Sequence, residues 1–223
     1  MFTACKTLKF SSLLIFLTIN SLSYAEPAEE KIMLGAFSTG SLEQWESKRF
    51  KNQTLYQLFE LDGAQVLKAD SNDSASGLFK TQRIDLQQTP VLNWRWRIEN
   101  RLDTRNEQIK TGDDYAARVY VVISGGLAFW QTKAINYVWA NASAKGAVWP
   151  NAYAGKSAVM IAMRSAADPT GTWFSEKRDV LADLKQHFGE DVRYIDAVAI
   201  MTDTDDSKGK ATSYYGDIYF SQR

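Results

Sequence analysis

VLNWRWRI, residues 91–98, alternates apolar and polar side chains with a period of two. The apolar residues fall on one face of an extended chain: Leu92, Trp94, Trp96 and Ile98. The polar residues fall on the other: Asn93, Arg95 and Arg97. Because side chains alternate across a β-strand, the stretch predicts a strand that turns its two tryptophans toward a hydrophobic core.

The same alternation recurs along the chain and predicts further strands at residues 115–124, 135–140, 156–165, 194–203 and 213–220. Earlier, residues 55–61 and 64–70 flank Asp62-Gly63, which is typical of a tight β-hairpin turn. Many short strands separated by Gly, Asn and Asp turns favour an all-β fold. We expect a β-sandwich or jelly roll of antiparallel strands.

One segment has helical instead of strand periodicity. Between residues 178 and 188, apolar residues recur at the spacing of a helix face, and Gly189 suits a C-terminal cap. The sequence therefore predicts one short helix, at about 178–188, packed against the sandwich.

The N-terminus resembles an export signal. Lys6 and Lys9 precede a short apolar run, and Ser23-Tyr24-Ala25 offers small residues where a signal peptidase cuts. We expect cleavage of residues 1–25, a flexible leader at 26–31, and a single β-sandwich domain over 32–223. The protein is then periplasmic or secreted, without an integral membrane span, because the apolar run is too short to cross a bilayer.

Composition excludes several classes of function. Cleavage removes the only cysteine, Cys5, and two of the 26 basic residues but none of the 26 acidic ones, which leaves a net charge of about −2. Thiol catalysis and a histidine-rich zinc site are excluded, since His187 is the only histidine. A near-neutral chain without a basic cluster argues against nucleic acid as a partner.

Carboxylate side chains remain as candidates for chemistry, and four of them lie in MTDTDDSKGKATSYYGDIYF, residues 201–220. Asp203 and Asp205 follow an apolar strand. The stretch is not an EF-hand loop, because Lys208 and Tyr214 stand where that loop needs glycine and glutamate. A solvated turn, a calcium site of another kind and a catalytic carboxylate all stay open.

A second acidic segment directly precedes a strand. Asp113 and Asp114 lie just before residues 115–124, and Arg118 shares a strand face with Asp114. We predict that this segment meets Asp203 and Asp205 at one end of the sandwich. The resulting polar site would bind a ligand or a cation.

Aromatic residues near turns form a third group, namely Trp149, Tyr153, Trp173, Tyr214 and Tyr215. Exposed rings stack on the C–H faces of sugars, whereas nearby polar side chains bind the hydroxyl groups. The alternative is that these rings only seal the edges of the sandwich. The predicted ligand-binding residues are therefore Asp113, Asp114, Arg118, Trp149, Tyr153, Asp203, Asp205 and Tyr214.

Several motifs together resemble the domain-of-unknown-function family 3047, a set of bacterial exported proteins: LNWRWRIEN, KTGDDYAARVYVVI, INYVWAN, GTWFSEKRDVLADLKQHFGE and AVAIMTDTDDSKGKATSYYGDIYF. The resemblance extends from about Phe37 to Phe220. It implies a periplasmic setting and a β-sandwich like those of carbohydrate-binding modules. It assigns no catalytic residue.

A looser resemblance links residues 37–79 and 214–220 to the first and last strands of jelly-roll sugar-binding modules. In those folds a final-strand aspartate helps to hold a structural calcium, and Asp217 is the matching position. Together with the acidic stretch, this gives Asp203, Asp205 and Asp217 as predicted calcium ligands.

Three functions are consistent with these features. The first is an exported, non-catalytic binding module for a polysaccharide or another envelope component, with or without calcium. The second is a carboxylate-dependent glycoside hydrolase or polysaccharide lyase. The third is a structural protein of an envelope assembly that binds no small ligand. A groove with unpaired polar groups and exposed rings would favour the first, and facing carboxylates in a pocket the second.

Overall fold

A computed structural model of the chain describes Met1 and residues 31–104, 106–128, 131–189 and 192–223. The predicted signal peptide, residues 1–25, lies outside the described residues except for Met1, as does the leader except for Lys31. Within the described part of the chain, no helix has the length and apolar character needed to cross a membrane.

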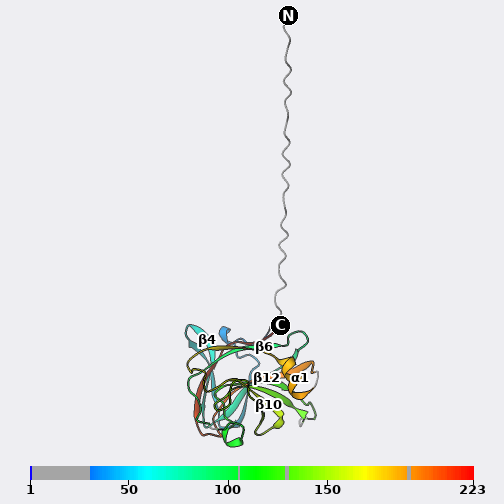
Figure 1. The fold of residues 1–223 in the computed structure, drawn as a ribbon. Coiled ribbons are helices and arrows are strands. Elements are labelled where there is room, and N and C mark those ends of the chain that lie inside the picture. Colours follow the sequence, from blue (N-terminus) through cyan, green and yellow to red (C-terminus); the bar gives the residue numbers. More distant parts are fainter. Residues whose placement is uncertain (2–30, 105, 129–130, 190–191) are drawn as a thin grey trace.

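The described chain folds into two facing β-sheets, as the period-two pattern predicts (Figure 1). Sheet A contains β1 (Lys31–Gly35), β14 (Ile218–Ser221), β6 (Val91–Ile98), β13 (Lys210–Tyr215), β4 (Ala64–Asn72) and β3 (Leu55–Leu61), in that order, and β11 (Phe174–Asp179) also pairs with β6. Sheet B contains β2 (Glu46–Lys51), β5 (Ala75–Asp85), β12 (Tyr194–Asp203), β7 (Arg118–Ile123), β8 (Lys133–Trp139), β10 (Gly155–Arg164) and β9 (Val148–Asn151).

The short elements have local causes. The turn between β3 and β4 places Asp62 and Gly63 at φ values of 54° and 74°, the left-handed region that a two-residue hairpin turn needs. The predicted helix is α1 (Val180–Phe188). Its N-cap is Asp179, whose side chain accepts the N–H of Ala182 at 3.0 Å, and Gly189 ends it at φ 68°. Two 3-10 turns, η1 (Phe37–Thr39) and η2 (Lys110–Gly112), precede β2 and β7.

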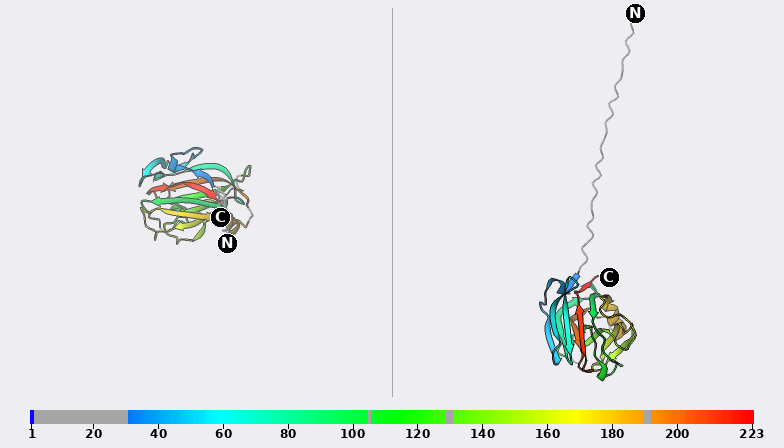
Figure 2. Two further views of the ribbon diagram at one scale, coloured as in Figure 1. Left: turned by 90° about the horizontal axis from the view of Figure 1, so that it is seen from above. Right: turned by 90° about the vertical axis from the view of Figure 1, so that its left-hand side faces the viewer.

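The hydrophobic core lies between the sheets, with α1 at one side (Figure 1). Trp94 and Trp96 are buried there, as their alternation with arginines predicts, and their rings contact edge to face with centroids 5.5 Å apart. Val180 and Leu184 of α1 reach the same core. Figure 2 shows the layered arrangement from two further directions. Each sheet thus has a core-facing side and a side that we call its outer face.

One strand pair departs from the antiparallel expectation. β8 and β10 run parallel, whereas the other strand pairs of the described chain are antiparallel. The segment between them crosses over and contributes β9, which pairs antiparallel with β10 at the sheet edge.

Candidate functional site

The two predicted acidic segments meet at one end of sheet B. Arg118 begins β7, and its guanidinium donates a hydrogen bond from Nη2 to Oδ2 of Asp203 at the end of β12. The two side chains are buried, with exposed fractions of 5% for Arg118 and 1% for Asp203. The backbone N–H of Tyr115 donates to the other oxygen of Asp203, at 3.2 Å. The predicted meeting is confirmed, and it has the form of a buried ion pair.

Asp114 anchors the loop that follows β12. Its Oδ1 accepts the backbone N–H of Asp206 at 3.2 Å, and its Oδ2 accepts that of Ser207 at 2.6 Å. The side chain is fully buried. Because both oxygens are used by the backbone, the local role of Asp114 is to hold the loop.

Asp113 and Tyr153 also lie at this end of sheet B. We call the residues gathered there the acidic cluster: Asp113, Asp114, Arg118, Tyr153, Asp203, Asp205 and Asp206. Asp113 Oδ2 accepts Nδ2 of Asn151 at 2.9 Å, whereas its Oδ1 is buried without a partner. The hydroxyl of Tyr153 donates to Oδ1 of Asp206 at 2.6 Å, and its ring is 58% exposed. The amine of Lys110 lies 5.2 Å from that ring.

Burial and like charge control the pKa values here. Burial raises the pKa of Asp203 well above its usual value, and the charges of Asp114 and Asp113 add to the rise against the attraction of Arg118. Burial also raises the pKa of Asp113, again opposed by Arg118. The attraction of Arg118 therefore offsets only part of the rise in the pKa of Asp113 and Asp203.

The carboxylates that could hold a metal ion are not the set that the sequence predicts. Carboxylate oxygens of Asp114, Asp205 and Asp206 lie within 4.8 Å of one another. Burial raises the pKa of Asp205, and the charges of Asp206 and Asp114 raise it further. Of the predicted ligands, only Asp205 belongs to this group, since Asp203 pairs with Arg118.

Asp217, the third predicted calcium ligand, lies in sheet A just before β14. Its Oδ1 accepts the N–H of Ser38 at 2.8 Å and its Oδ2 accepts the hydroxyl of the same serine at 2.5 Å. Asp217 therefore holds the η1 turn against sheet A. It is not part of the carboxylate group that contains Asp205.

Two predicted aromatic residues occupy other places. The expectation of an exposed Trp149 ring is wrong: its exposed fraction is 4%, and the ring packs with Tyr115 and Met160. Trp149 lies on β9, an edge strand that tolerates the following proline, and not in a turn. Tyr214 is buried on sheet A, between the rings of Phe59 and Trp173 at 5.9 and 6.5 Å.

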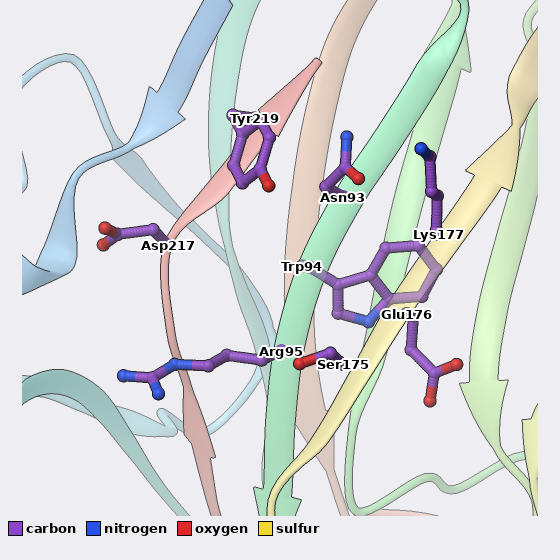
Figure 3. Close-up of a pocket in the computed structure, with 8 residues that line it drawn as sticks. All are labelled: Asn93, Trp94, Arg95, Ser175, Glu176, Lys177, Asp217 and Tyr219. Atoms are coloured by element: carbon purple, nitrogen blue, oxygen red, sulfur yellow. The ribbon is translucent and has the colours of Figure 1, made fainter. Parts of the chain in front are cut away.

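A groove of about 440 Å³ lies on the outer face of sheet A (Figure 3). It is lined by Asn93, Trp94, Arg95, Ser175, Glu176, Lys177, Asp217 and Tyr219. β6 forms its centre, with β11 on one side and β14 on the other. The register aligns Lys177 and Tyr219 with Asn93, so these side chains share the face opposite to the core.

Arg95 is the most distinctive group of the groove. Its guanidinium lies 4.8 Å from the centroid of the Trp173 ring, and its side chain passes over Gly216, which has no Cβ to obstruct it. Among the described residues, neither Arg95 nor Lys177 has a carboxylate partner. The alternation at residues 91–98 predicts an outward-facing Arg95 but does not single it out as a binding residue.

The model of the family described as "Protein of unknown function (DUF3047)" matches residues 43–219. The chain belongs to the DUF3047 family. This confirms the resemblance that the motifs indicated. No curated protein matches the DUF3047 chain.

Solved structures with a similar fold have little sequence in common with this DUF3047 protein. A mutant of a carbohydrate binding module family 29 is 9% identical, with 86% of this chain and 92% of that chain covered and a TM-score of 0.40. Endoglucanase cel12A from Rhodothermus marinus is 10% identical, with coverages of 86% and 99% and a TM-score of 0.46. A structure of carbohydrate-binding modules from the beta-sandwich super family is 11% identical. The match covers 82% of this chain and 58% of that chain, with a TM-score of 0.43.

Proposed function

We propose that this DUF3047 protein is a non-catalytic binding module that holds a glycan in the groove on the outer face of sheet A. The observation that carries the proposal is the groove itself, with its unpaired polar groups beside aromatic rings. Its volume of about 440 Å³ lies within the range of small-molecule sites, about 300–1,000 Å³.

The lining chemistry suits sugar hydroxyl groups. Tyr219 lines the groove with a partly exposed ring that offers a face to sugar C–H groups. Asn93, Ser175 and Arg95 supply donors and acceptors between them. A sugar ring has hydroxyl groups around its edge and C–H groups on its faces, so it can contact both the polar side chains and the aromatic ring.

The carboxylates that border the groove are already engaged, which supports binding without catalysis. Glu176 accepts hydrogen bonds from Arg164 Nε at 2.5 Å and from Trp96 Nε1 at 3.1 Å. Asp217 accepts both of its hydrogen bonds from Ser38. A general acid and base must exchange protons with a ligand, and these two groups are held by the protein.

One observation favours the alternative of a carboxylate-dependent hydrolase or lyase. Asp113 has a raised pKa and a buried oxygen without a partner, a combination also found in catalytic acids. Release of reducing or unsaturated ends from polysaccharides, lost in Asp113→Asn, would establish this alternative. Binding without product release supports the module.

Binding to immobilised or gel-embedded polysaccharides tests the main proposal. Arg95→Ala is expected to weaken retention, whereas the matched control Arg83→Ala keeps it. Arg83 also lies over an aromatic ring, 4.1 Å from the centroid of Tyr194, but outside the groove. Equal retention of both variants and the parent protein would refute the placement of the ligand.

Export and calcium binding stay predictions. Export is tested by fusing residues 1–25 to alkaline phosphatase, which is active only outside the reducing cytoplasm. For calcium, the oxygens of Asp205 and Asp206 are the available ligands, since Asp114 already serves the backbone. A bound ion would raise the melting temperature in CaCl₂ relative to EDTA, and the rise would vanish in Asp205→Asn. Identical melting curves in both solutions would exclude it.

A further inference from the structure

We infer that the ligand of the groove is an anionic glycan whose carboxylate groups are bound by Arg95 and Lys177. This inference rests on the proposed function and adds the chemical class of the ligand. It starts from the charge balance of the groove. Two lining side chains are cationic, Arg95 and Lys177, and two are anionic, Glu176 and Asp217.

The two anions do not offset the two cations. Glu176 forms an ion pair with Arg164, at 2.5 Å, and is buried. Asp217 accepts two hydrogen bonds from Ser38 and forms no ion pair with Arg95 or Lys177. Arg95 and Lys177 therefore keep their positive charge available to a ligand.

Most arginines of the described chain pair with a carboxylate, and Arg95 does not. Arginines that pair with carboxylates are Arg97, Arg118, Arg164, Arg178, Arg193 and Arg223. Arg97 is two residues from Arg95 on the same strand face, yet it is bound by Glu99 at 2.6 Å and Asp62 at 3.1 Å. The fold thus supplies counter-ions beside Arg95 but gives none to Arg95 itself.

Arg95 is also held in place before any ligand arrives. Trp173 supports one face of the guanidinium, and Gly216 gives the aliphatic part a path across the backbone. A planar guanidinium in a fixed orientation binds a carboxylate through two parallel hydrogen bonds. Because the side chain is already ordered, less conformational entropy is lost on binding.

The two cations lie at opposite ends of the groove, with Tyr219, Asn93 and Ser175 between their tips (Figure 3). Two cations at opposite ends of a groove can each bind a different negative charge. A polymer that repeats a negative charge along its length supplies two such charges, whereas a small ligand with one anionic group supplies only one. The polar and aromatic groups between them suit the sugar rings. Uronic acid polymers combine these features.

Polygalacturonate and its fully methyl-esterified form provide a matched pair of probes, since they share a backbone and differ in charge. We expect the purified protein to bind polygalacturonate at least about tenfold more tightly than the ester in calorimetric titrations. Binding should weaken as NaCl rises from 50 to 500 mM, because salt screens the contact. Alginate should behave like polygalacturonate, and dextran sulfate shows whether sulfate replaces carboxylate.

Variants separate the groove from general electrostatic attraction. Arg95→Ala is expected to lower the affinity for polygalacturonate about tenfold and Lys177→Gln about threefold, whereas Arg83→Ala leaves it unchanged. Equal affinity for the acid and its ester would overturn the anionic ligand but leave glycan binding intact. An equal loss in Arg83→Ala would overturn recognition by the groove. No binding to the acid, the ester or a panel of neutral polysaccharides would refute the proposed function as well.

Discussion

Arg118 and Arg95 lie on the outer faces of opposite sheets, and their surroundings differ in every respect that matters for binding. Arg118 is buried and tied to Asp203, among carboxylates that the fold itself uses. Arg95 is partly exposed, rests on a tryptophan and has no carboxylate partner in the described chain. The comparison teaches that charge at the acidic cluster serves the fold, whereas charge at the groove is left for a ligand.

The largest expected effect is on stability at the acidic cluster. Arg118→Ala leaves Asp203 buried and unpaired, and breaking a buried ion pair in this way costs about 3–5 kcal/mol. Urea unfolding followed by tryptophan fluorescence measures the loss. The matched change in the groove, Arg95→Ala, should stay within about 0.5 kcal/mol of the parent.

A double variant shows whether the cost comes from the orphaned charge. Arg118→Met combined with Asp203→Leu removes both charges, so it should recover much of the stability lost in Arg118→Ala. If Arg118→Ala unfolds no more easily than Arg95→Ala, the distinction between the two arginines fails.

The next effect concerns binding at the groove. Gly216→Ala places a methyl group in steric overlap with Nε and Cγ of Arg95, so this side chain must shift. The guanidinium is then displaced from Trp173, and we expect an affinity loss of about tenfold, or about 1.4 kcal/mol. Calorimetry with polygalacturonate measures it, and the unfolding midpoint serves as a check that the fold is kept. Full affinity in this variant would show that the position of Arg95 is unimportant.

The smallest expected effect is a pH dependence from Asp113. Burial raises its pKa in the folded state, so its contribution to stability falls as the pH rises from about 4 through that raised value. Asp113→Asn removes this loss and should gain about 0.5–1 kcal/mol at pH 7 but nothing at pH 4. Melting temperatures at the two pH values test the sign.

Asp168 gives the opposite control. Burial acts against its ionisation, but the N–H of Ser165 and the guanidinium of Arg164 lower its pKa overall. Its contribution is therefore present above about pH 4 and is lost as the pH falls through the lowered pKa. Asp168→Asn should destabilise the protein at pH 7, where Asp113→Asn stabilises it. The same sign for both variants at pH 7 would contradict this account of the cluster.

Much of the fold could be predicted because its causes are local. Alternation at residues 91–98, the Asp62-Gly63 turn and the spacing in α1 each specify an element without distant contacts. The meeting of the acidic segments was predicted on a different ground, because each lies at the end of an apolar strand and a buried arginine needs a carboxylate partner. The pairing of β7 with β12 brings them together.

The groove could not be predicted because it depends on pairing between distant strands. Residues 93–95, 175–177 and 217–219 come together only when β11 and β14 join β6. The alternation placed Arg95 outward but gave no sign that its neighbours would leave it without a counter-ion. Burial of Trp149 likewise depends on Tyr115, which comes from a loop 34 positions earlier in the chain.

Backbone amide shifts during a titration with oligogalacturonate test the central claim most directly, because they report both sites at once. If the ligand binds in the groove, the largest changes fall at residues 93–95, 175–177 and 217–219. Largest changes at residues 113–118 and 203–206 would contradict binding in the groove and move the ligand to the acidic cluster.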